Sequence, residues 1–258
     1  MIARAPLERW ERDILETVRD EAHYYVPQGM TKIMNEGWAT FWHSRIMTRH
    51  ILRDFEVIDF ADHHSGTVAS APGQVNPYKL GVELWRSIED RWNTGKFGSE
   101  YERCDDAEKR RTWDTKAMLG AQKIFEVRRI YNDVTFIEEF FTEDFAREHN
   151  YFVYRRNPRT GHMEVGDRNP RAVKEALLRR ITNAGNPVVV VEDANYKNRG
   201  ELFLVHEHHG VDLQSDHAEE TLRMLHRIWK RPVHMKTLDE GKERILSFEA
   251  AESEAKKS

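Results

Sequence analysis

The chain has 258 residues, enough to bury one or two cores, and its 39% hydrophobic and 33% charged residues are an ordinary balance for a soluble protein. A net charge of -4 gives no overall attraction for nucleic acid, and no apolar run of ~18 residues is present to cross a membrane. The first residues lack the apolar segment of a secretory signal, and one cysteine, Cys104, excludes an internal disulfide. A reducing cytoplasm is therefore the expected compartment.

The first 150 residues have the periodicity of helices. Apolar residues recur every three or four positions from Leu7 to Ala22, which predicts an amphipathic helix ended by the segment 26–29 (VPQG). Thr31 is the expected N-cap of a second helix that reaches about Phe55. Because this helix carries large apolar side chains on nearly every face, we expect it to be buried in the middle of its domain.

A loop containing His63 and His64 is expected next, and Asn76 with Pro77 is typical of the start of a further helix. Residues 93–112 are polar and charged, which predicts an exposed excursion. Three more helices are expected over residues 116–131, 133–141 and 143–148, the last of them capped by Thr142.

From about residue 150 the pattern changes to strands interleaved with helices. Strands are expected at 151–154, 163–165, 188–191, 202–205, 233–238 and 245–248, and helices at 172–181 and 216–229. The four valines from Val188 to Val191 are typical of a buried strand. The sequence therefore predicts an α+β protein, with a helical domain over 1–150, a small α+β domain over 151–249 and a tail over 250–258.

The polar residues of the second helix are its most informative feature. Glu36, His43 and His50 are spaced in heptads and so share one stripe of a helix. A heptad rises ~10.5 Å, whereas zinc bonds are about 2 Å long, so Glu36 and His43 are not expected to chelate one ion unaided. Two interpretations stay open. Glu36 is a metal ligand and His43 a ligand or substrate-facing acid–base, or Glu36 pairs with a buried cation and His43 with a backbone carbonyl.

A second cluster begins after the strand at 202–205. His206 and His208 share one face of an extended strand, which suits metal ligation if another element adds a third ligand, although a solvent-facing edge strand shows the same pattern. Asp193, Asn195 and Arg199 follow the expected buried strand. There they predict either a substrate or partner loop or a capped turn between two strands.

Ordered segments along the chain resemble the SpoVR family (stage V sporulation protein R). They are residues 31–39 (TKIMNEGWA) with His43, 75–81 (VNPYKLG), 132–137 (NDVTFI) with 141–142, 193–202 (DANYKNRGEL) with His206 and 210–213, and 229–233 (WKRPV). Members of the family are usually longer, so the chain is expected to correspond to the carboxy-terminal part of the usual length.

The resemblance implies a role in spore cortex formation or in a stress or starvation pathway, beside a PrkA-like serine kinase and a von Willebrand A-type protein. The segment 36–39 (EGWA) also resembles the helix that supplies a glutamate ligand in gluzincin-type zinc peptidases, although the chain has no HExxH motif. One expected function is a component of a metal-dependent amide hydrolase that binds Zn through Glu36 and the His206–His208 pair, with His43 catalytic. The other is a non-catalytic scaffold or regulatory partner of the kinase and its companion.

Overall fold

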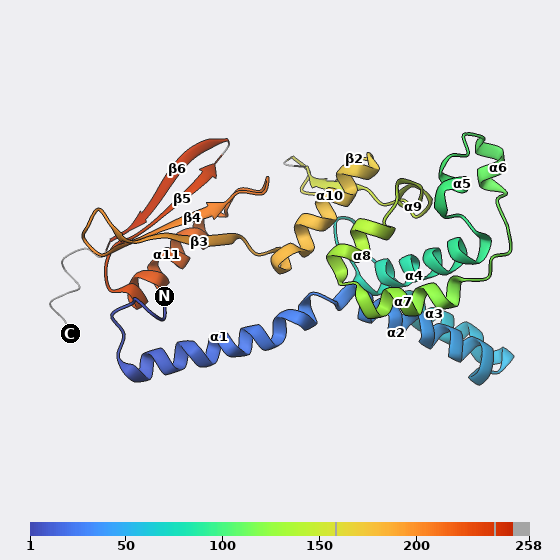
Figure 1. Cartoon of the computed structure of the whole chain (residues 1–258), viewed down its shortest axis with the longest axis horizontal. Coiled ribbons are helices and arrows are strands. Elements are labelled where there is room, and N and C mark those ends of the chain that lie inside the picture. The colour runs from blue at the N-terminus through green and yellow to red at the C-terminus, as the bar shows by residue number, and fades with distance from the viewer. Residues whose placement is uncertain (158, 240, 250–258) are drawn as a thin grey trace. The chain divides into compact units, whose positions relative to one another are not determined.

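The structure is a computed structural model that describes residues 1–157, 159–239 and 241–249. The chain forms two compact units (Figure 1). The first, called here the helical unit, is Pro27–Thr182; the second, the sheet unit, combines Met1–Val26 with the residues from Asn183 onward. The predicted α+β class is confirmed. In the described part of the chain, no helix combines the length and apolarity that crossing a bilayer requires.

The helical unit is built from helices that follow one another closely along the chain. They are α2 (Lys32–Ile46), a π-helical segment (Met47–Ile51), a 3-10 turn (Asp54–Glu56), α3 (Val57–Val68), α4 (Pro77–Thr94), α5 (Gly98–Glu102), α6 (Ala107–Arg111), α7 (Gly120–Ile130), α8 (Asp133–Phe140), α9 (Glu143–Glu148) and α10 (Pro170–Ile181). A hairpin of β1 (Val153–Arg156) and β2 (Met163–Asp167) precedes α10. Two of the predicted caps are present, since Asn76 accepts from the Tyr78 amide at 2.9 Å and Thr142 from the Phe145 amide at 3.2 Å.

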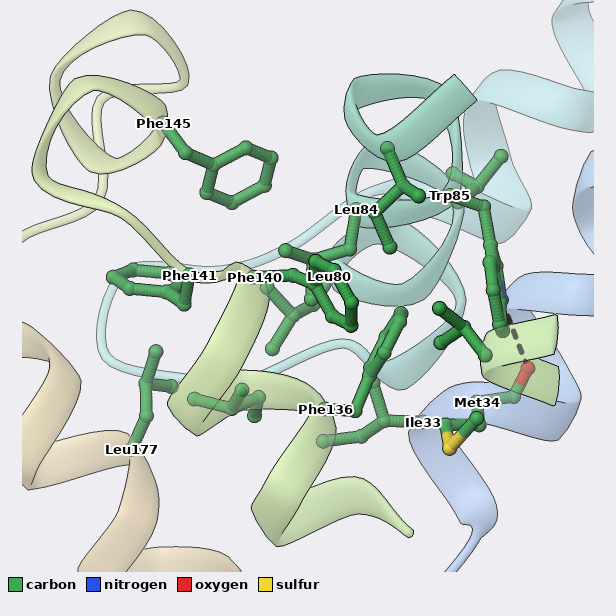
Figure 2. Close-up of a cluster of buried hydrophobic side chains, with 14 of the residues drawn as sticks. Ile33, Met34, Leu80, Leu84, Trp85, Phe136, Phe140, Phe141, Phe145 and Leu177 are labelled. Carbon is green, nitrogen blue, oxygen red and sulfur yellow. Dashed lines mark hydrogen bonds between the residues drawn. The ribbon is translucent and has the colours of Figure 1, made fainter. Parts of the chain in front are cut away.

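The centre of the helical unit is the crossing of α2 and α4. Gly37 and Gly81 touch there, because a Cβ on Gly37 would lie only 2.3 Å from the Gly81 Cα. This close approach brings the Trp85 indole N–H to the carbonyl of Met34 at 3.1 Å, the dashed line in Figure 2. Aromatic and aliphatic side chains from α4, α8, α9 and α10 complete the core around it (Figure 2).

The N-terminus of α2 is capped from far along the chain. The Ile33 and Met34 amides donate to the two carboxylate oxygens of Asp133, at 2.8 and 2.9 Å. Thr31 stands at the predicted N-cap position but makes no side-chain cap, because its hydroxyl donates to the carbonyl of Pro27 at 3.0 Å. Asp133 is buried, and burial raises its pKa while the amides oppose that shift.

The sheet unit has a four-stranded sheet with α11 (Ser215–Trp229) packed on one face (Figure 1). Its strands stand in the order β3 (Val188–Tyr196), β4 (Glu201–Glu207), β5 (Val233–Asp239) and β6 (Lys242–Phe248), and only the β4–β5 pair is parallel. The covered face buries Leu202, Leu204, Val233 and Met235. Ala5 packs into this core too, which places the start of the chain in the sheet unit.

Several elements differ from those expected. The first helix, α1 (Arg9–Gly29), continues through Pro27 instead of ending before it. Residues 57–68 form α3 rather than a loop. The strand that begins at Val188 lies at the edge of the sheet, and Val189 to Val191 are 36–49% exposed. The prediction that its β-branched residues form a buried strand is therefore wrong.

The second predicted helix is buried only in its first part. Ile33, Phe41 and their neighbours are covered by the core, whereas His43 is exposed and Ile46 is 44% exposed. The helix ends at Ile46, and a π-helical segment follows up to Ile51. Because a π-turn bonds residue i to i+5, the expected stripe of Glu36, His43 and His50 is not continued in register.

The compact units do not coincide with the domains expected at 1–150 and 151–249. The hairpin β1–β2 and helix α10 cluster with the helical unit, since Val173 and Leu177 are buried in its core. Residues 1–26 cluster with the sheet. The expected tail at 250–258 lies outside the described residues.

Candidate functional site

An apolar hollow opens on the helical unit where α2, the π-helical segment, α3 and α4 meet. It has a volume of about 500 Å³. Its apolar walls are Phe41, Val57, Phe60, Ala61 and Val68. We call it the α2–α3 hollow. Its volume falls in the range of ~300–1,000 Å³ that is typical of binding pockets.

The ionisable side chains that line the α2–α3 hollow are arginines and a histidine. Arg45, Arg49, Arg86 and His64 line it, and none of its lining residues is an acid. Arg45 is neutralised by a bidentate ion pair with Glu89 on α4, one arm of which measures 2.8 Å.

Two of these cations have no carboxylate partner. Arg86 donates only to the Ser44 hydroxyl, at 3.4 Å, and neither Arg49 nor Arg86 makes an ion pair with any residue in the described ranges. The hollow therefore presents two uncompensated positive charges beside apolar walls.

His43, the predicted catalytic residue, stands at the edge of this hollow. Its ring centroid is 5.6 Å from that of Phe60, and Phe60 stacks in turn on His64 at 5.7 Å. Burial, together with the charges of Arg86 and His43, lowers the pKa of His64. His64 is thus neutral at pH 7, and the positive charge of the hollow comes from its arginines.

Glu36, the predicted metal ligand of α2, is half-buried against α4. The Tyr78 hydroxyl forms a hydrogen bond with the Glu36 carboxylate, and that bond raises the pKa of Tyr78. This partner is a phenol and not the buried cation that the structural interpretation supposed.

His206 and His208 lie beside each other, with ring centroids 5.8 Å apart. His206 is buried and its Nδ1 is 2.8 Å from the Thr237 hydroxyl, while His208 Nε2 is 2.8 Å from the carboxylate of Asp212. Burial lowers the pKa of His206, and the charges of the neighbouring histidines add to the effect. Among residues 1–157, 159–239 and 241–249, no three His, Cys, Asp or Glu side chains form a group that could hold a metal ion.

The predicted substrate or partner loop forms the tight end of the β3–β4 pair. Asp193 accepts from the Asn195 amide and Asn195 accepts from the Gly200 amide, both at 2.8 Å. Arg199 forms an ion pair with Glu201 at the start of β4. Most of the polar groups of this segment are therefore used within the turn itself.

A chain of polar side chains crosses β4, β5 and β6, with Glu201 and His234 buried and Ser247 exposed, and it was not expected from the sequence. Ser247 Oγ is 2.8 Å from His234 Nδ1, and His234 Nε2 is 3.0 Å from the carboxylate of Glu201. Burial raises the pKa of Glu201, but the hydrogen bond with His234 and the charge of Arg199 outweigh it, so that pKa lies below its usual value. The position of His234 between buried apolar residues of β5 indicated a buried histidine in the sequence. The partners of His234 lie on other strands, so the sequence did not indicate them.

Comparison with known proteins places the chain in a family. Residues 1–186 match the family described as SpoVR like protein, and residues 187–240 match the SpoVR-like C-terminal domain. The chain is also 25% identical over 248 residues to the Escherichia coli (strain K12) protein named Uncharacterized protein YcgB, a match that covers 89% of this chain and 46% of YcgB. The chain thus spans about half the length of the curated relative it matches. No solved structure matches it. With both family matches in sequence order along it, the chain belongs to the SpoVR-like family.

Proposed function

We propose that this chain is a partner-binding component, a non-catalytic scaffold or regulatory partner of a PrkA-like serine kinase and a von Willebrand A-type protein. The observation that carries the proposal is the α2–α3 hollow, an apolar surface with basic side chains around it and no acid among its lining residues. The two partners come from the family resemblance.

Large apolar side chains are exposed in the same stretch of chain that supplies lining residues of the hollow. Ile51, Phe55 and Ile58 are 59%, 70% and 71% exposed. Soluble proteins seldom expose several large apolar side chains in one short segment unless the surface binds a partner. The segment from the end of α2 to the start of α3 therefore has the composition of an interface core.

The charges indicate what kind of segment would bind. A partner that inserts an aromatic or branched aliphatic side chain between Val57 and Phe60 brings its flanking residues to Arg49 and Arg86. Acidic flanking residues would compensate both charges, which speeds association and fixes orientation. We therefore expect the docking segment of the partner to carry an apolar anchor with carboxylates on either side.

The test uses the purified chain with the purified kinase and, separately, with the von Willebrand A-type protein. Val57→Glu places a carboxylate in the apolar wall, where it disrupts the contact with the apolar anchor and competes with the partner's carboxylates for Arg49 and Arg86. It is expected to weaken binding by at least about tenfold, which corresponds to ~1.4 kcal/mol. Ile130→Glu on α7 is the matched control, because Ile130 is 68% exposed in the same unit and does not line the hollow. A chain that binds neither partner contradicts the proposal, and so does a Val57→Glu variant that binds as tightly as the parent.

The family resemblance also raised a metal-dependent amide hydrolase that acts in spore cortex or stress biology. For the residues of this chain, that function would need Glu36 to exchange its bond with Tyr78 for a metal ion and to gain further ligands. It stays a prediction, and the metal content of the purified protein tests it separately from partner binding.

A further inference from the structure

A second cavity lies in the helical unit, away from the α2–α3 hollow. It has a volume of about 240 Å³ and is lined by residues 70–76, the first turn of α4, residues 149–154 and helix α10. Its apolar walls include Val75, Leu80, Val153, Val173 and Leu177. The two pockets share no lining residue, so this cavity needs an explanation of its own.

The lining of the cavity contains basic side chains and no acidic ones. Lys79, His149 and Arg180 line it, and no Asp or Glu does. Neither Lys79 nor Arg180 makes an ion pair with any residue that the structure describes. The Lys79 ammonium stands 5.9 Å from the ring centroid of Tyr151, another wall residue.

An acid close to Lys79, Glu83, does not line the cavity and already has hydrogen-bonding and ionic partners. Glu83, one turn after Lys79 on α4, accepts from the Tyr151 hydroxyl at 2.6 Å and lies 3.6 Å from His149 Nδ1. Burial raises the pKa of Glu83, but the hydrogen bonds with His149 and Tyr151 and the charge of Lys79 outweigh burial, so the pKa of Glu83 lies below its usual value. Glu83 is thus ionised and offsets part of the positive charge near Lys79, while Arg180 has no carboxylate partner among the described residues.

The cavity is also preformed. The Asn76 amide holds the preceding loop by donating to the carbonyls of Thr67 and Ala69, at 2.9 and 2.7 Å. From the other side, Arg180 Nη1 donates to the carbonyl of Gly73 at 2.8 Å. A loop held at both ends loses little conformational freedom when a ligand enters, and this favours affinity.

We infer that this cavity binds a small organic anion, a carboxylate or phosphate carried on a compact apolar body. Lys79 and the remaining donors of Arg180 bind the anionic group, and the valine and leucine walls hold the body. The volume is below the ~300 Å³ at which pockets for larger ligands begin, so the body is about the size of one ring.

Four probes test the inference on the full chain by isothermal titration. Phenyl phosphate and benzoate carry both features, benzyl alcohol only the ring, and inorganic phosphate only the charge. Saturable binding is expected for phenyl phosphate, benzoate or both, at least about tenfold tighter than for the two incomplete probes. The inference is overturned if neither phenyl phosphate nor benzoate saturates the chain below ~10 mM. It is also overturned if benzyl alcohol or inorganic phosphate binds as tightly as the organic anions.

Variants locate the site. Lys79→Gln and Arg180→Gln are each expected to weaken the tighter organic anion by about tenfold, the effect of losing one charge-assisted contact. Arg179→Gln is the matched control on α10, since Arg179 pairs with Glu175 and does not line the cavity. Arg180→Gln also removes the hydrogen bond to the Gly73 carbonyl and could unfold that loop. In that case the binding of Lys79→Gln is the test, because the Lys79 ammonium makes no hydrogen bond in the described structure and its loss leaves the loop intact. Unchanged binding in Lys79→Gln, or equal loss in Arg179→Gln, contradicts the inference.

Discussion

Asp133 is the residue whose removal tests the architecture of the helical unit most sharply. It lies at the start of α8, yet its carboxylate accepts from the Ile33 and Met34 amides at the start of α2. Asp133→Ala removes both acceptors without altering the sequence of α2. The change is therefore expected to destabilise the helical unit through α2, the helix that carries the family motif and one wall of the hollow.

The magnitude follows from the two amides. Each buried N–H left without an acceptor costs about 1–3 kcal/mol, so two of them amount to ~2–6 kcal/mol. Burial raises the pKa of Asp133, which means that the ionised carboxylate is itself penalised, and its removal offsets part of this cost. We expect a net loss of about 2–4 kcal/mol, a large part of the ~5–15 kcal/mol by which a domain is stable.

Amide hydrogen exchange of Ile33 and Met34, with urea unfolding of the same variant, measures the effect. Both amides should exchange faster in Asp133→Ala, and the unfolding midpoint should fall. The control is Asp62→Ala, an exposed acid of the same unit, which should change stability by less than ~0.5 kcal/mol. If Asp133→Ala is as stable as Asp62→Ala, the capping role is wrong.

Three further predictions concern other parts of the molecule. Gly37→Ala should lower the free energy of unfolding by about 1–3 kcal/mol, and with it the urea midpoint, because the added Cβ would lie 2.3 Å from the Gly81 Cα; an unchanged midpoint would refute the close crossing. The lowered pKa of Glu201 means that its contribution is present above its unfolded value of ~4.3 and is lost as the pH falls through the lower folded value, so Glu201→Gln should flatten the acid limb of sheet-unit stability. That stability can be followed by the indole signal of Trp229, which donates to the Gly200 carbonyl, and an unchanged acid limb would argue against the pair. Elemental analysis should find the same zinc content in the parent and in Glu36→Gln, since Glu36 is bonded to Tyr78; stoichiometric zinc lost in the variant would favour the hydrolase.

Local signals in the sequence identified most elements of the fold. Asn76 before Pro77, and Thr142 before α9, are caps whose partners lie within three residues, so the sequence predicts them directly. The helix over residues 57–68 was missed because its histidines and Gly66 suggested a loop. The valines of β3 indicated a strand but not its place at the edge of the sheet, since position in a sheet depends on its neighbours.

The features that organise the candidate sites are contacts between distant residues. Asp133 caps α2 through the amide of Ile33, 100 residues earlier in the chain, and no pattern around Thr31 indicates this. The sequence indicated His43 as functional, but the arginines beside it and the closing helix α3 were not part of the prediction. Likewise, Lys79 was recognised within a family segment, whereas Arg180 reaches the same cavity from α10.

The affinity of the purified chain for the PrkA-like kinase and for the von Willebrand A-type protein, measured after charge reversal of the hollow, tests the central claim most directly. The double variant Arg49→Glu with Arg86→Glu should bind about 100-fold more weakly, because two favourable charge contacts become repulsive. Arg129→Glu, an exposed arginine outside the hollow, should stay within about twofold of the parent. Equal affinity of the double variant and the Arg129→Glu control for both partners would contradict partner binding at the α2–α3 hollow.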